Sequence, residues 1–93
     1  MSKPQYEEIL NIFKNKNIAK YGGGTPIDPN TTIEDLILTQ KNTPGNQYFY
    51  IITLFYNLKT QYTNRAQIAI GYNLNEMHQR FFFENHWSEW RKI

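Results

Sequence analysis

The pattern of apolar residues divides the chain into a short helical stretch and a longer β-rich part. Between residues 4 and 20, Ile9 and Phe13 recur at the spacing of one helical face. Three consecutive glycines at positions 22–24 follow, and such a run ends a helix. We therefore expect an N-terminal helix within residues 1–21. A helix of this length is marginal in water by itself, so it should pack on the rest of the molecule or on a second copy.

Downstream of the glycines the apolar pattern changes to that of strands. Residues 47–57 are apolar at both odd and even positions, which is typical of a central strand covered on both faces. The helix or a neighbouring subunit could supply the second cover. Residues 65–72 alternate instead, and the predicted inward side chains are Ala66, Ile68, Ile70 and Tyr72.

Two further strands are expected at residues 77–84 and 87–93, and short turns separate all of these segments. Short strands joined by short turns predict an antiparallel meander. Residues 33–38 remain open between a helical turn and a short extended segment. The predicted fold class is α+β, with an N-terminal helix at 1–21 and an antiparallel β-meander or sandwich-like knob at 22–93.

Composition limits the classes of function. The 93 residues fit one domain, and the net charge of +2 comes without a basic cluster, which argues against nucleic acid as a partner. The chain has no cysteine, so neither disulfides nor thiolate zinc sites are expected. No apolar stretch approaches the ~20 residues of a membrane span. The high aromatic content, 16%, suits both a β core and a recognition surface.

No residue pattern points to catalysis. His78 and His86 lack a third partner at the spacing of a metal site. Glu76, Glu84 and Glu89 fall on different predicted strands, and nothing marks them as an acid–base pair. The sequence therefore predicts a protein that is not an enzyme and that carries neither a cofactor nor a metal ion.

The C-terminal segment contains two tryptophans, Trp87 and Trp90, three positions apart. In a regular strand this spacing places them on opposite faces, so one should be buried and the other partly exposed. Their neighbours Arg91 and Lys92 allow cation–π contacts along the strand.

The ending from Trp87 to Ile93, together with Gln67–Ala69, Met77 and Arg80, resembles the C-terminal knob of phage tail fibres, the pyocin-knob type. An upstream segment with Asp28, Thr43-Pro44-Gly45, Tyr48 and Tyr50 is similar to the same family, and the match covers about residues 26–93. The resemblance implies a virion protein that acts outside the cell. It would be a homo-oligomer, most naturally a trimer, that contacts host-surface glycans or other tail proteins.

Side chains near the turns between strands are the candidates for binding, because they are not needed for packing in the core. Aromatic and multi-donor groups there suit stacking on sugars or pairing with anionic polymers, and the candidates are Tyr62, Tyr72, His78, Arg80, His86 and Trp87. Two other functions stay open. A small inhibitor of a host protein or nucleic acid would be a monomer with a coherent charged face, and a hydrolytic accessory enzyme would need a cleft with paired carboxylates.

Overall fold

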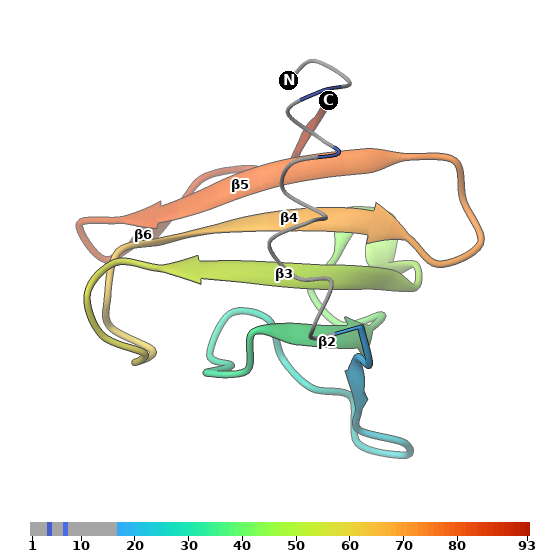
Figure 1. Ribbon diagram of the computed structural model, residues 1–93, viewed down its shortest axis with the longest axis horizontal. Helices are drawn as coiled ribbons and strands as arrows, with labels where there is room; N and C mark the ends of the chain where they lie inside the picture. The colour runs from blue at the N-terminus through green and yellow to red at the C-terminus, as the bar shows by residue number, and fades with distance from the viewer. Residues whose placement is uncertain (1–3, 5–6, 8–16) are drawn as a thin grey trace.

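The computed structural model describes Pro4, Glu7 and residues 17–93, and its strands form one mixed sheet (Figure 1). The strands lie in the order β1-β2-β3-β4-β5-β6, and β7 also pairs with β5. A short 3-10 turn, η1, precedes β3. The bounds are β1 (Lys20–Tyr21), β2 (Leu36–Thr39), η1 (Pro44–Asn46), β3 (Phe49–Phe55), β4 (Arg65–Gly71), β5 (Met77–Phe83), β6 (His86–Trp87) and β7 (Arg91–Lys92).

The predicted α+β class is wrong. Residues 17–93 contain no α-helix, and Lys20 and Tyr21, the last residues of the segment expected to be helical, form β1. Their backbone pairs in parallel with Ile37 and Leu38, which satisfies peptide groups that a helix would have satisfied internally. Most of the predicted helix otherwise lies outside the described residues. No described helix has the length and apolar character needed to span a membrane.

The antiparallel meander is confirmed for β3 to β6, and the segment left open at residues 33–38 contributes most of an additional strand, β2. Each of these strands pairs antiparallel with the next one along the chain, and β2, β3, β4 and β5 lie side by side in Figure 1. The sandwich-like arrangement is wrong, because the strands belong to a single sheet. Loops cover one face where a second sheet would stand in a sandwich.

The expectation of a central strand covered on both faces is confirmed for β3. It lies between β2 and β4, and its neighbours Ile51 and Ile52 point to opposite faces yet are 0% and 2% exposed. The strand therefore contributes to two apolar clusters. We call one side the loop-covered face, with Ile37, Ile51 and Ala69, and the other the opposite face, with Leu36, Ile52 and Ile68.

The loop between β1 and β2 is held on the loop-covered face. Asp28 closes the turn, since its carboxylate accepts from the backbone N–H of Asn30 and its carbonyl accepts from Thr31 and Thr32. Ile27 packs on the apolar cluster, and its carbonyl accepts a hydrogen bond from the Thr39 hydroxyl. The docked loop therefore covers this face of the sheet, as a second sheet would in a sandwich.

The burial of β4 differs from the predicted pattern. Ala66 and Ile70 are half-buried and Tyr72 is exposed, whereas Arg65 and Gln67 are buried on the loop-covered face. Polar side chains can be buried here because the docked loop presents carbonyl and amide oxygens to them. Only Ile68 of the four side chains predicted to point inward is fully buried.

The C-terminal strand is interrupted by a β-bulge. Phe82 pairs with Trp87, but Gln79 pairs with Arg91, so the C-terminal strand holds one more residue than β5 between these two pairs. The backbone N–H of Ser88 donates to the Phe81 carbonyl, and the Ser88 hydroxyl accepts from the Phe81 N–H. The extra residue changes which face the following side chains occupy.

This bulge overturns the prediction that Trp87 and Trp90 lie on opposite faces. Both indoles are half-buried and both contact Arg80, on the loop-covered face. The alternation rule holds only for a regular strand, and one inserted residue puts positions i and i+3 on the same side.

Candidate functional site

Two groups of aromatic side chains lie on the two faces of the sheet. The first alternates rings and arginines along the loop-covered face. The Arg80 guanidinium lies 3.8 Å from the Trp87 ring centroid and 4.4 Å from that of Trp90. Arg65 lies 4.2 Å from the Phe82 ring and 4.9 Å from Trp87. We call this series, Phe82–Arg65–Trp87–Arg80–Trp90, the arginine ladder.

Hydrogen bonds tie the arginine ladder to the docked loop. Arg80 donates from Nε to Gln67 Oε1 at 2.8 Å and from Nη2 to Asn30 Oδ1 at 2.7 Å. Gln67 Nε2 donates to the Pro29 carbonyl at 2.7 Å, and Arg65 donates to the carbonyl of Asn30 at 2.8 Å. Neutral oxygens and ring faces therefore hold these two cations.

Burial lowers the pKa of both arginines. Desolvation lowers the pKa of Arg80 to about 10, while the field of Asp28 acts in the opposite direction and that of Arg65 adds to the lowering. Desolvation also lowers the pKa of Arg65. Arg80 remains protonated at neutral pH, so its interactions are those of a cation. Arg65 and Arg80 are 5% and 7% exposed, so the two arginines are buried, and the rings of the arginine ladder that cover them are half-buried.

His78 lies on the same face and is also buried. Its Nε2 lies 2.9 Å from Glu76 Oε1, and its ring stands edge-on to Phe49 at 5.4 Å between centroids. The hydrogen bond from His78 is the main cause that lowers the pKa of the Glu76 carboxyl, and the charge of Lys92 contributes. The structure thus gives His78 and Arg80 internal partners, although both were predicted to bind at the surface.

The second group is a cluster of four tyrosines at one end of the opposite face. Tyr50 lies in β3, and Tyr48 directly precedes that strand. The two side chains are half-buried and, being two residues apart, point to the same face of the sheet. The Tyr72 ring lies 6.0 Å from Tyr48 and 5.8 Å from Tyr50, tilted by 54° to each. Tyr21 pairs with Leu38, which itself pairs with Tyr50. We call Tyr21, Tyr48, Tyr50 and Tyr72 the tyrosine cluster.

The tyrosine cluster offers both ring faces and hydroxyl groups to solvent. Tyr21 and Tyr72 are each 53% exposed. A hydrogen bond with the Tyr21 hydroxyl, followed by the field of the same group, raises the pKa of Tyr48 above its usual value. The Tyr48 hydroxyl therefore stays protonated at neutral pH, and a tyrosine hydroxyl can both donate and accept. A flat, amphipathic ligand with its own hydroxyl groups fits such a surface.

The six predicted binding residues do not form one surface. Tyr72 belongs to the tyrosine cluster, and Trp87 lies in the arginine ladder with Arg80. Tyr62 is 74% exposed in the loop between β3 and β4, where its hydroxyl accepts from Gln61. His86 is exposed at the start of β6, after the turn at Glu84 and Asn85, whose φ angles are both positive. This two-residue geometry is the one that favours tight hairpins.

The prediction of binding residues missed Tyr21, Tyr48 and Tyr50. A signal for two of them is present in the sequence, since Tyr48 and Tyr50 share one side of a predicted strand. That Tyr72 lies beside them can be inferred only from the register in which β3 pairs with β4. Tyr21 could not be placed, because the sequence indicated a helix there.

The described residues hold no group of three or more His, Asp or Glu side chains suited to a metal ion. Comparisons with models of protein families, with curated proteins and with solved structures find no match. The residues of the chain itself must therefore carry the functional argument.

Proposed function

We propose that this protein is a non-catalytic binding module that recognises neutral glycans through the tyrosine cluster. The observation that carries the proposal is the gathering of four tyrosines at one end of the sheet, with Tyr21 and Tyr72 half exposed. They come from β1, from β3 and from the residues directly before β3 and after β4. Burial in a core does not account for the exposed part of these two rings.

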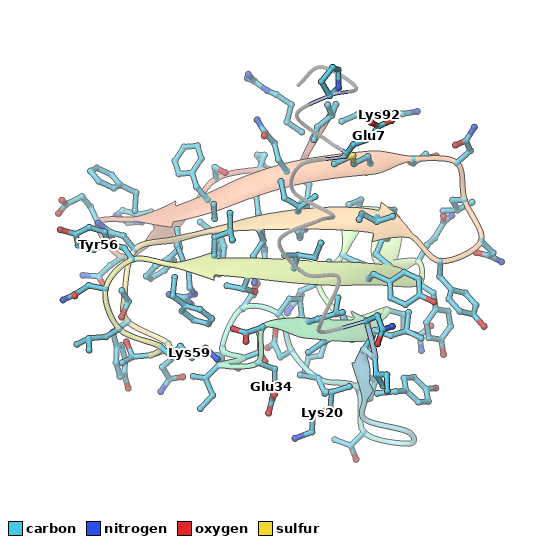
Figure 2. The ribbon with its side chains drawn as sticks, in the orientation of Figure 1. Glu7, Lys20, Glu34, Tyr56, Lys59 and Lys92 are labelled. Carbon is cyan, nitrogen blue, oxygen red and sulfur yellow. The ribbon has the colours of Figure 1, made fainter. Side chains whose placement is uncertain are left out.

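Sugar rings match the chemistry of this surface. A pyranose has an apolar face of C–H groups that stacks on an aromatic ring, and a rim of hydroxyls that pairs with tyrosine hydroxyls. The cluster itself is uncharged. Lys20, the cation adjacent to Tyr21, is paired with Glu34 at 3.1 Å (Figure 2). A neutral ligand is therefore favoured over an anionic polymer.

The resemblance of residues 26–93 to tail-fibre knobs supports a bacterial host surface as the source of the glycan. A tail-associated protein would meet that surface outside the cell, as part of a virion. In that setting a weak individual site is sufficient, because several copies on one particle bind together.

Binding of the purified protein to isolated bacterial cell walls and to a glycan array tests this proposal. We expect Tyr72→Ala and Tyr21→Ala each to weaken binding at least tenfold, because each removes an exposed stacking surface. Tyr62→Ala is the matched control, since it removes an exposed tyrosine outside the tyrosine cluster.

Unchanged binding by both cluster variants, or equal loss in the Tyr62→Ala control, would contradict the proposed site. A folded wild type that binds neither cell walls nor any glycan would contradict the function itself.

A further inference from the structure

The end of the opposite face away from the tyrosine cluster carries a second exposed surface, which is apolar. Tyr56 is 72% exposed, Phe81 57%, Phe83 55% and Leu54 38%. These side chains, with Ala66, line a groove of about 760 Å³. Tyr56 directly follows β3 and lies at the end of the sheet in Figure 2. We call Leu54, Tyr56, Ala66, Phe81 and Phe83 the apolar patch.

From this patch we infer that a second copy of this chain docks on the end of the sheet, patch against patch. The inference does not depend on the glycan proposal, because Tyr48 and Tyr56 lie at opposite ends of β3, about 26 Å apart at ~3.3 Å per residue. A partner on the apolar patch leaves the tyrosine cluster accessible.

The exposed area supports an interface. An aromatic side chain presents about 200 Å², so the exposed fractions of Tyr56, Phe81 and Phe83 correspond to roughly 370 Å². The largest apolar patch on an ordinary monomer is about 300–600 Å² and is often functional. The smallest stable interfaces need about 600 Å² from each partner, and these three rings supply more than half of that.

The shape of the apolar patch favours a second copy of the chain as its partner. Leu54, Ala66 and Phe81 form one row across three strands, and the small side chain of Ala66 separates the two larger ones. The surface therefore carries a hollow beside projecting aromatic rings. A two-fold interface requires both features on the same patch, since each copy must receive what it inserts.

Charge is also consistent with pairing of like surfaces. Among the described residues, the one charged residue that lines the groove is Arg65, and its guanidinium is engaged in the arginine ladder on the other face. Two identical patches can therefore approach without repulsion between like charges, and they bury no unpaired ion.

Light scattering and sedimentation over a range of protein concentrations test the inference. The wild type should approach twice the 11.1 kDa mass of the chain. Phe81→Glu and the milder Phe81→Ser should each weaken self-association at least tenfold, since the first places two carboxylates in a paired apolar surface. Tyr62→Glu is the matched control, because it adds the same charge at an exposed aromatic position outside the patch.

Near-ultraviolet circular dichroism of each variant shows whether its core remains folded. A folded Phe81→Ser that becomes monomeric while Tyr62→Glu remains a dimer supports the inference. A wild type that is monomeric at all concentrations, one with the mass of a trimer, or folded Phe81 variants that pair as well as wild type would overturn it. Glycan binding by such a protein would leave the proposed function standing.

Discussion

Arg80 joins several parts of the loop-covered face. It stacks between Trp87 and Trp90, and its guanidinium donates to Gln67 on β4 and to Asn30 in the docked loop. A planar fork of donors can serve two acceptors at fixed angles while its faces contact rings, which an ammonium group cannot do. The choice of arginine at this position therefore follows from geometry as well as from charge.

Replacing Arg80 should destabilise the fold. In Arg80→Met, Gln67 Oε1 and Asn30 Oδ1 lose their donors inside the protein, and we expect a loss of about 2–4 kcal/mol in the free energy of unfolding. Arg80→Lys should lower the free energy of unfolding by a similar amount, because lysine keeps the charge but lacks the planar set of guanidinium donors. Urea denaturation measures both.

Gln79→Met serves as the control for this pair. Gln79 is the exposed neighbour of Arg80 on the opposite face, so its replacement should change stability by no more than about 0.5 kcal/mol. An Arg80→Met variant as stable as the control would show that the guanidinium does not hold the docked loop.

At the scale of elements, the bulge between β6 and β7 decides which side chains complete the arginine ladder. If the present sequence continued in regular pairing after Trp87, Trp90 would point to the opposite face and Arg80 would keep one indole neighbour. The exposed Glu89 lies within the bulge, whereas Trp87 and Trp90 on either side contact Arg80. The bulge is thus part of how the sequence builds its core.

Deletion of Glu89 should be tolerated. It would convert the bulge to regular pairing with Trp87 and Trp90 two positions apart, and so still on one face. We expect a change in unfolding free energy below about 1 kcal/mol, against roughly 2–4 kcal/mol for Trp90→Ala, which removes a half-buried indole. Thermal or urea unfolding of the two variants provides the comparison, and equal losses would contradict this account of the bulge.

The strands were predictable from the sequence because they depend on local periodicity. Residues 47–57 and 77–84 contain β3 and β5 within one or two residues of their ends. The face of the sheet to which each side chain points was less predictable. The burial of Gln67 depends on a carbonyl 38 residues away, and the side of Trp90 depends on one bulged residue. Lys20 and Tyr21 form a strand because they pair with β2, and a local pattern of residues does not indicate such pairing.

The candidate site was predictable only in part, for the same reason. Tyr72 was identified, but its partners come together through the register of three strands. His78 and Arg80 have the chemistry of a binding surface, but both have partners inside the protein. His78 pairs with Glu76 just before β5, and Arg80 donates to Gln67 on β4 and to Asn30 in the docked loop. A polar residue in a short chain therefore cannot be assigned to surface or core until the covering segments are placed.

On the scale of the whole molecule, the opposite face carries two exposed aromatic surfaces at its two ends. The tyrosine cluster includes the residue before β3, and the apolar patch includes the residue after it. Pairing through the apolar patch would keep two tyrosine clusters accessible in one assembly. Two linked sites bind a repetitive surface far more tightly than a single site does, typically by 10²–10⁴-fold where the geometry allows both to engage.

This arrangement predicts that Phe81→Glu separates two kinds of binding. Affinity for a short soluble fragment released from the cell wall should be unchanged, because Phe81 lies at the far end of the sheet from the tyrosine cluster. Retention on intact cell wall should fall at least tenfold, because the variant engages one site at a time. Calorimetry with the fragment and a pull-down with the wall measure the two quantities. Equal losses in both assays would mean that Phe81 supports the tyrosine cluster itself, and no loss in either would mean that pairing contributes nothing to attachment.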